Sequence, residues 1–377
     1  MDDIRINFFG DFKCDDTSSL LIDNRLKNLL SLGDINIVNF EAPVLSGKRK
    51  KIVKDGPAIN QDVLAPKYLT DLSFNAISLA NNHAMDYGED GMKETINAFP
   101  SDVVMGAGLW EDVYRPLIIE VKQKKVAIIA VTHHEFGVLS DEIQQKNRYG
   151  TAWMSHPAVD EIIVDTKREC DFIFIYVHAG YENESYPLPE LRTLYRHFIN
   201  MGADGVFASH PHVPQPWENY KNKIIAYSLG NFCFDNPSVN NDLWYWSLVM
   251  SLEIKNDGSL KVIPHFCYFN SQDRSLSLMD DDKFINNHMN KINDIFSDDH
   301  KYLNEINFFC KRNIDKYMAN FSLFGFPSLS WKSVIKQCIK RLFKLENNID
   351  HHVLNNFRCE SHRWLIERYI REKHQLR

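Results

Sequence analysis

Short apolar runs recur along this chain, and most of them stop at glycine, proline or a polar side chain. Runs of this kind predict buried strands. We expect strands at residues 4–10, 35–40, 75–80, 103–105, 117–121, 126–132, 171–177, 205–208 and 224–229. Residues 244–254 and 260–269 predict a hairpin around Asn256, Asp257 and Gly258, because these residue types favour tight turns.

Helical periodicity, with apolar residues three and four positions apart, fills several of the intervals between these strands. It predicts helices at residues 20–32, near 61–72, from Gly88 onward and at 189–201. Strands that alternate with helices indicate an α/β fold.

Oxygen and nitrogen ligands gather where six of the predicted strands end: Asp11, Glu41, Asn82, His178, the pair His210 and His212, and Asn231. Ligands bind at the carboxyl ends of strands in open α/β sheets. Carboxylates, imidazoles and an amide suit Mn²⁺, Fe²⁺ or Zn²⁺ better than Ca²⁺. Each residue alone has a structural alternative, such as a helix cap for Asp11 or a satisfied core histidine for His178. Together they indicate a site for one or two divalent ions.

Residues 79–88, LANNHAMDYG, are the most informative stretch. An apolar run breaks here into Asn81, Asn82 and His83, and Gly88 follows. His83 has the chemistry to carry a proton, and Asp86 is near enough in sequence to orient it. The alternative is that the asparagines cap a turn and His83 is an ordinary loop histidine.

Length and composition limit the architecture and the compartment. With 377 residues, we expect one large domain at residues 1–270 and a mostly helical extension at 271–377. No stretch approaches the roughly 18 apolar residues of a membrane span, and the acidic start lacks the features of a signal peptide. The seven cysteines are widely spaced without a CxxC, which favours reduced thiols. We therefore expect a cytoplasmic protein.

The formal charge of −7 is unevenly distributed. Residues 331–377 carry eleven Lys and Arg against five Asp and Glu, so the remaining body is strongly acidic. An acidic body disfavours nucleic-acid binding. Residues 333–345 have apolar side chains on one helical face and a stripe of lysines beside it. This helix could make peripheral contact with the inner face of the membrane or pack on its own domain with its lysines in solvent.

Several blocks of this sequence together resemble the CapA family of capsule and poly-γ-glutamate biosynthesis proteins. They are GDF at 10–12, NFEAPV at 39–44, LANNHAMDYGEDG at 79–91, HAGYE at 178–182, GAD at 202–204, SHPHVPQPWE at 209–218 and YSLGNFCFD at 227–235. That family is a branch of the calcineurin-like metallophosphoesterases. The resemblance implies a two-sheet sandwich flanked by helices, with the site at one edge.

The resemblance also implies roles for residues already singled out. Asp11 looks like an aspartate that holds one metal, and Glu41 stands where a carboxylate bridges two. Asn82 looks like an amide ligand and His83 like the proton-handling histidine, with Asp86 beside it. His178 and His210 would complete one metal site and His212 the other. The expected substrate contacts are Lys13, Asn81, Glu182 and Asn231.

One departure from the family pattern changes the expected metal content. Catalytic metallophosphoesterases carry Asp-x-His in the first motif, whereas this chain reads Asp11, Phe12, Lys13. An ammonium group in place of an imidazole would repel a second cation. We therefore expect one tightly held metal, with Lys13 supplying positive charge to an anionic ligand. A solvated lysine at the exit of the strand is the alternative.

The functional expectation is a metal-dependent hydrolase acting on a phosphoester in a precursor of a bacterial surface polymer. The alternatives are a noncatalytic subunit that binds an anionic polymer for a synthase complex, and a metal-assisted group transfer onto a capsule sugar. The expected partners are an anionic or phosphorylated polymer precursor and the capsule synthesis machinery, without nucleic acid.

Overall fold

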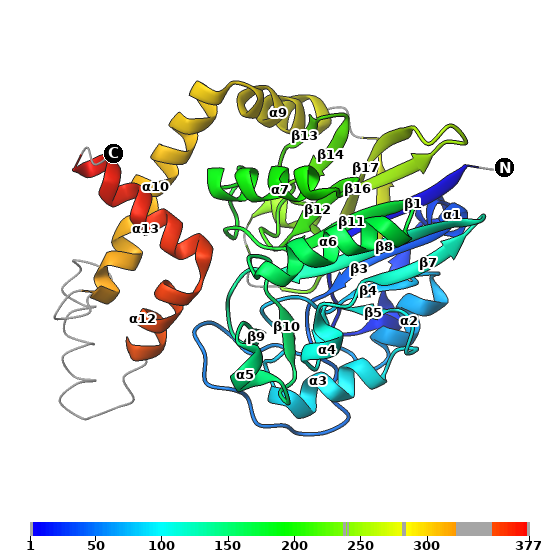
Figure 1. Ribbon diagram of the computed structural model, residues 1–377, viewed down its shortest axis with the longest axis horizontal. Helices are drawn as coiled ribbons and strands as arrows, with labels where there is room; N and C mark the ends of the chain where they lie inside the picture. Colours follow the sequence, from blue (N-terminus) through cyan, green and yellow to red (C-terminus); the bar gives the residue numbers. More distant parts are fainter. Residues whose placement is uncertain (1–2, 237–238, 240, 281–283, 322–348, 375–377) are drawn as a thin grey trace. The chain divides into compact units, whose positions relative to one another are not determined.

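The computed structural model describes residues 3–236, 239, 241–280, 284–321 and 349–374 (Figure 1). Contacts divide the chain into two units, Met1–Ile52 with Ala58–Asp294, and Val53–Pro57 with Ile295–Arg377. The expected boundary at residue 270 stays a prediction. No helix within the described ranges is long and apolar enough to cross a membrane. The amphipathic helix expected at residues 333–345 lies outside the described residues.

The first unit contains a large mixed sheet whose centre is β1 (Ile4–Lys13). β1 runs parallel to β3 and β15 and antiparallel to β16. The strand order is β2-β18-β17-β16-β1-β3-β4-β5, with β15 paired to β1. Their bounds are β2 Leu21–Ile22, β3 Ile35–Phe40, β4 Ala76–Ser78, β5 Val104–Met105, β15 Asn231–Phe234, β16 Trp246–Ile254, β17 Leu260–Asn270 and β18 Ser275–Met279. β16 and β17 form the predicted hairpin.

A second sheet has the order β13-β14-β12-β11-β8-β7. Its members are β7 Leu117–Val121, β8 Lys124–Thr132, β11 Phe172–His178, β12 Gly205–Ser209, β13 Trp217–Tyr220 and β14 Lys223–Ala226. The four strands from β14 to β8 are parallel, so the ends of β11 and β12 meet at one edge. A small third sheet joins β6 Ala107–Gly108, β9 Val138–Leu139 and β10 Gly150–Ala152.

Side-chain alternation along β1 explains how the two large sheets pack. Phe8 belongs to an apolar cluster that also contains Phe174 and Phe207 of the second sheet, and its ring stacks on Phe207 at 3.5 Å between centroids. Phe9, the next residue, points to the other face and joins a separate cluster. Because neighbouring side chains of a strand face opposite ways, one strand serves both cores.

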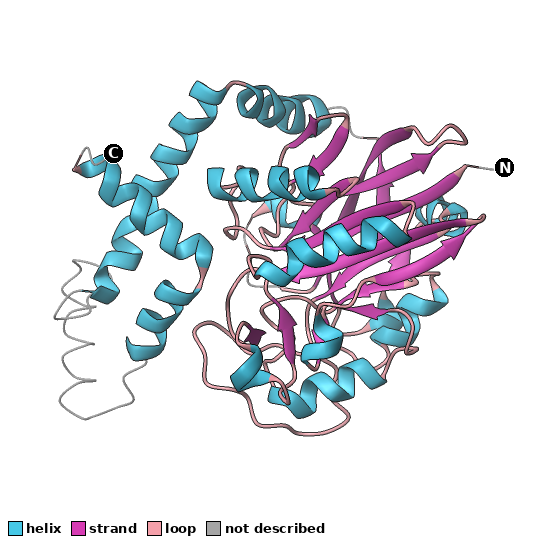
Figure 2. Ribbon diagram, viewed as in Figure 1, coloured by secondary structure: helices cyan, strands magenta, loops and turns pink. Residues whose placement is uncertain are grey.

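Helices cover the outer faces of this sandwich (Figure 2). Buried side chains of α1 (Asn24–Leu32), α2 (Ala65–Asp71) and α3 (Gly88–Asn97) join the cluster that contains Phe9. α6 (Pro157–Glu169) and α7 (Pro189–Met201) contact β11 and β12 of the second sheet. Short helices occur at α4 Trp110–Val113, α5 Glu142–Gln145, Thr17–Ser19 and Asp242–Tyr245. The predicted α/β fold, a two-sheet sandwich flanked by helices, is confirmed.

The described residues after β18 are mostly helical, as predicted. A π-helical segment at Ile285–Met289 leads into α9 (Asn290–Ser297). The second unit contains α10 (Asp299–Phe321), α12 (Ile349–Arg358) and α13 (Glu360–Lys373), and α10 packs against both of the others.

Several predicted elements were wrong in their bounds. The strand expected at 4–10 continues to Lys13, so Asp11 lies inside β1 and not after its end, and the strand expected at 75–80 ends at Ser78. Helix 20–32 begins only at Asn24, because Leu21–Ile22 pair with β18 as a strand and the Asp23 side chain caps the helix by accepting from the Leu26 N–H. The strand expected at 224–229 ends at Ala226. Asn231 therefore begins strand β15 and does not follow the end of a strand.

Candidate metal centre

Strand register brings the chemically active residues to one edge of the sandwich. Asp11 pairs with Asn39 of β3 and with Asn231 of β15, and His178 pairs with Ser209 at the end of β12. The close approach of β1 to the turn before β15 requires glycine. A Cβ on Gly10 would lie 1.8 Å from the carbonyl oxygen of Gly230. That same oxygen accepts a hydrogen bond from the Asp11 N–H at 2.9 Å, so this contact fixes the position of the Asp11 backbone.

Two groups of buried side chains have ligand atoms close enough to share a metal ion. One is Asp11, Glu41 and His178, and the other is Glu41, His210 and His212, with the ligand atoms of each group within 4.8 Å of one another. Glu41 belongs to both groups. Its Oε1 lies 3.7 Å from Nε2 of His178 and 3.5 Å from Nε2 of His212.

Nε2 of His178 marks the point where ligands converge. Oδ1 of Asn82 and Nδ1 of His210 each lie 3.0 Å from this nitrogen. The structure thus brings together all six metal ligands expected from the sequence: Asp11, Glu41, Asn82, His178, His210 and His212. Their ligand roles remain predictions.

The ionisation of this cluster is compatible with a bound cation. Burial raises the pKa of Asp11, but the hydrogen bond to His178 and the neighbouring imidazoles outweigh it and lower the pKa to about 2. Burial, then the nearby histidines, hold the pKa of His210 well below its usual value, so its imidazole is neutral. The charge partners of Asp11 among the described residues are imidazoles. Buried carboxylates beside imidazoles form a donor set that suits a divalent metal.

The turn that carries His210 and His212 is strained. Both residues adopt positive φ, 99° and 59°, in the region that favours glycine. The His210 N–H donates to Oδ2 of Asp11 at 3.0 Å. Nδ1 of His212 lies 2.9 Å from Oδ1 of Asn231, whose amide donates to the His212 carbonyl. Strain that the surroundings hold in place is typical of a functional site.

His83 has the partner expected from the sequence. Its Nδ1 lies 2.7 Å from Oδ2 of Asp86, and both side chains are buried. The His83 N–H donates to Oδ1 of Asn81 at 3.1 Å, which holds the turn that carries the ring. His83 is also among the imidazoles that lower the pKa of His210, so it belongs to the same electrostatic site.

The four expected substrate contacts have different surroundings. Nζ of Lys13 donates to Asp15 at 2.6 Å and to the Asp235 carbonyl at 2.9 Å, and Asn231 bonds to the His212 backbone. Asn81 donates to Oδ1 of Asn39 at 3.0 Å. Glu182 is exposed in the turn after β11. Three of the four thus have polar partners inside the protein, and their contact with substrate remains a prediction.

Asn39 is the main residue of the site that sequence reasoning missed. Its amide donates to Oδ1 of Asp11 at 2.8 Å and lies 3.1 Å from Nδ1 of His178. It also reaches Oε2 of Glu41 at 3.5 Å. A signal was present, because Asn39 stands two residues before Glu41 in a mostly apolar run, and residues two apart share a face of a strand.

Ser209 and His133 also adjoin the cluster without having been expected there. Oγ of Ser209 lies 3.2 Å from Nδ1 of His178. The buried ring of His133 stands edge-on to that of His210, 4.5 Å between centroids. The sequence placed both residues at strand ends, Ser209 directly before His210, but it gave neither of them a role at the ligands.

Curated relatives align with about half of this chain. It is 33% identical over 206 residues to the PGA biosynthesis protein CapA of Bacillus subtilis, covering 52% of each chain. The capsule biosynthesis protein CapA of Bacillus anthracis is 32% identical over 206 residues, covering 52% of this chain and 49% of the relative. A probable polyglutamine synthesis accessory protein of Mycobacterium tuberculosis is 27% identical over 183 residues, 45% of this chain and 48% of its own length. The chain spans about half the length of these relatives.

Solved structures are more distant. A Staphylococcus aureus protein assigned as a 5′-nucleotidase, solved with α-ketoglutarate, is 16% identical with a TM-score of 0.43, covering 81% of this chain and 58% of that one. A hypothetical protein of Thermus thermophilus is 15% identical with the same TM-score of 0.43, covering 70% of this chain and 98% of that one. At these scores neither likeness carries an argument.

A family model settles the relationship. The model described as bacterial capsule synthesis protein PGA_cap matches residues 16–236, more than half of the chain, and this stretch includes Glu41, His83, His178 and His210. The chain belongs to the PGA_cap family of bacterial capsule synthesis proteins.

Proposed function

We propose that this protein is a metal-dependent hydrolase that cleaves a phosphoester in a precursor of a capsule or poly-glutamate polymer. The observation that carries the proposal is the convergence of Asp11, Glu41, His178, His210 and His212 in two overlapping ligand groups. Family membership and the names of the Bacillus relatives support a role in capsule or polymer synthesis.

The donor set of the cluster fits a borderline divalent ion such as Mn²⁺, Fe²⁺ or Zn²⁺. Glu41 would be shared between two positions, with Asp11 and His178 on one side and His210 and His212 on the other. A metal bound there would polarise a phosphoryl oxygen and lower the pKa of a water molecule. Asn82, beside Nε2 of His178, would add an amide oxygen to the first position.

His83 would act as the general acid in this reaction. With Asp86 at Nδ1, the imidazole is held in one orientation, and Nε2 is the nitrogen that would pass a proton to the leaving oxygen. Asn81 acts through the backbone of His83 and is a positioning residue. Asn39 plays the same part for Asp11 and His178.

Metal reconstitution with an assay on a generic substrate tests the proposal. The stripped protein is loaded with Mn²⁺, Zn²⁺ or Fe²⁺ and assayed on bis(4-nitrophenyl) phosphate. We expect metal-dependent turnover that His178→Ala abolishes. His197→Ala is the matched control, because His197 lies on α7 and pairs with Asp160 in a separate ion pair. Bound metal without turnover on any phosphoester would reject the hydrolase.

The second candidate is a noncatalytic subunit that binds an anionic polymer for a synthase complex. Lys13 at the position of the usual histidine favours it, because the first metal position then lacks one imidazole ligand. The mycobacterial relative carries the words "accessory protein" in its name. Polymer binding that persists without turnover would support this candidate. A metal-assisted group transfer would instead require a labelled donor group to appear on the capsule sugar.

The compartment and the partners belong to the same proposal. A phosphorylated polymer precursor and the capsule synthesis machinery would meet this protein in the cytoplasm, at the inner face of the membrane. Fractionation of cells and crosslinking to the synthase test this part separately from catalysis.

A further inference from the structure

Four consecutive basic residues, Lys48 to Lys51, stand exposed on the connection between β3 and α2; we call them the basic loop. Arg49 pairs with Glu94 at 3.3 Å. Within the described residues, Lys48, Lys50 and Lys51 form no ion pair. The loop therefore presents three uncompensated positive charges on a chain whose formal charge is −7.

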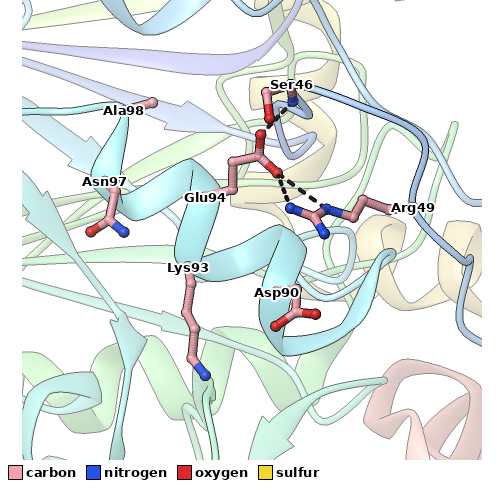
Figure 3. Close-up of a pocket in the computed structure, with 7 residues that line it drawn as sticks. All are labelled: Ser46, Arg49, Asp90, Lys93, Glu94, Asn97 and Ala98. Carbon is pink, nitrogen blue, oxygen red and sulfur yellow. Dashed lines mark hydrogen bonds and ion pairs between the residues drawn. The ribbon is translucent and has the colours of Figure 1, made fainter.

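The basic loop is anchored at its start to helix α3. The Ser46 N–H and the Arg49 guanidinium both bond to the carboxylate of Glu94 (Figure 3). An open hollow of about 560 Å³ lies beside these contacts, and Lys93 and Asn97 also line it. Anchoring lowers the entropy that a binding partner must remove when it orders the loop.

A second anchor connects the loop to the candidate metal centre. The Ile52 N–H donates to the Asp86 carbonyl at 3.0 Å, and the Ile59 N–H donates to Oδ2 of Asp86 at 2.7 Å. The same Oδ2 lies 2.7 Å from Nδ1 of His83. The backbone of Asp86 thus contacts Ile52, directly after the basic loop, and its carboxylate contacts Ile59, further along the same connection, and the ring of the proposed proton donor.

Four adjacent like charges repel one another, and among the described residues only one counter-charge meets them, that of Glu94 to Arg49. Lysine carries a point charge on a flexible stem, so each of the three ammonium groups can meet a separate carboxylate of a repeating polyanion. We infer that the basic loop binds an extended polycarboxylate chain and holds it beside the site that contains His83. This inference rests on the proposed function and names the polymer as the partner of that site.

Fluorescence anisotropy with labelled poly-L-glutamate tests the inference on the full, metal-loaded chain. The test variant removes three charges but keeps Arg49 and its anchor: Lys48→Ala, Lys50→Ala and Lys51→Ala. The control removes three exposed lysines from separate elements: Lys27→Ala, Lys125→Ala and Lys146→Ala. We expect binding to weaken about tenfold in the test variant and by less than about twofold in the control. Wild-type binding should fall as salt rises from about 0.05 M to about 0.3 M.

Three results would overturn the inference. They are no binding of poly-L-glutamate by the wild type, equal weakening in both triple variants, and loop-dependent binding to phosphatidylglycerol vesicles without binding to the polymer. The hydrolase proposal fails separately. Wild-type protein that binds the polymer but turns over no phosphoester removes the hydrolase alone, and turnover without polymer binding removes the loop inference alone.

Discussion

Two buried charged groups stand two residues apart on β1 and have different surroundings. Asp11 belongs to the candidate metal centre, where its charge partners are His178 and His212. Lys13 belongs to what we call the Lys13 network, with Asp15, Asp235 and Arg274. There Lys13 pairs with Asp15 at 2.6 Å, and Arg274 holds both oxygens of Asp235 at 2.7 and 3.0 Å.

The difference lies in how each region compensates charge. In the Lys13 network every carboxylate meets an ammonium or guanidinium, so the charges balance without a ligand. At the candidate metal centre the charge partners of Asp11 are the imidazoles of His178 and His212, and burial lowers the pKa of the neighbouring His210. A buried carboxylate without a permanent cation is costly. A divalent cation at the candidate metal centre would balance its carboxylates, whereas the Lys13 network is balanced by its own side chains.

The largest expected effect separates the two regions directly. Glu41→Ala removes the carboxylate shared by both ligand groups, so we expect metal content below about a tenth of an equivalent after reconstitution. Asp235→Ala, the matched change in the Lys13 network, should leave metal content unchanged. Elemental analysis of both proteins measures this. Equal metal loss in the two variants would contradict the distinction.

The next effect concerns chemistry without metal loss. His83→Ala should lower turnover by roughly 10²- to 10⁴-fold with full metal content, because it removes the proposed general acid. The readouts are kcat on an aryl phosphodiester and elemental analysis. Loss of metal would make His83 a ligand, and unchanged turnover would exclude it from the mechanism.

Asn39 tests whether the ligands need to be held in place. Asn39→Ala removes the amide that contacts Asp11 and His178, and we expect metal affinity to fall about 10- to 100-fold. Asn7→Ala is the matched control, since Asn7 is also a buried amide of this sheet but bonds to Asn36. Competition with a fluorescent chelator gives both affinities. An equal loss in Asn7→Ala would reduce the effect of Asn39 to general destabilisation.

Replacing Lys13 tests whether this residue stabilises the fold through its network or contacts the substrate, as the sequence led us to expect. Its bonds to Asp15 and to the Asp235 carbonyl lead us to expect that Lys13→Ala lowers the free energy of unfolding by about 1–3 kcal/mol and leaves metal content and KM unchanged. Urea unfolding and steady-state kinetics measure the two effects. A raised KM with unchanged stability would restore Lys13 as a substrate contact, and Lys13→His would then be expected to raise metal stoichiometry.

The smallest effect is a pH dependence of the metal-free protein. The pKa of His210 is lowered from its usual 6.5 by burial, so below about pH 6.5 the unfolded chain takes up a proton that the folded chain does not. Above this pH, His210 does not lower the free energy of unfolding. As the pH falls below it, the free energy of unfolding decreases by at most about 1.4 kcal/mol per pH unit. Urea unfolding in chelator at several pH values should show this slope, and His210→Asn should reduce it. A flat profile in the wild type would contradict the assignment.

The sequence predicted the α/β fold and the ligand set because both depend on local pattern. The run at residues 35–40 is a strand in the structure, and 189–201 is a helix with the expected bounds. Asp11, Glu41 and His178 were found as polar residues that close apolar runs. Parallel pairing aligns such ends at one edge, so their proximity could be expected.

Other features depend on contacts between distant parts of the chain, and the sequence could not indicate them. The position of Asn231 depends on β15 pairing with β1, more than two hundred residues away in sequence. The partner of Lys13 depends on the same pairing, which brings the Asp235 carbonyl to its ammonium. Charge and spacing alone therefore did not decide whether Lys13 belongs to the candidate metal centre or to the Lys13 network.

By itself, the sequence determined which residue types occur at the strand ends, because side-chain chemistry and apolar periodicity are local properties. Only the tertiary structure decided that Asn39 touches Asp11 and His178, that Asp86 contacts both His83 and the segment after the basic loop, and that Lys13 pairs with Asp15. The physical reason is that hydrogen bonds and ion pairs require atoms within about 3–4 Å. For residues far apart in sequence, that closeness depends on sheet register and packing.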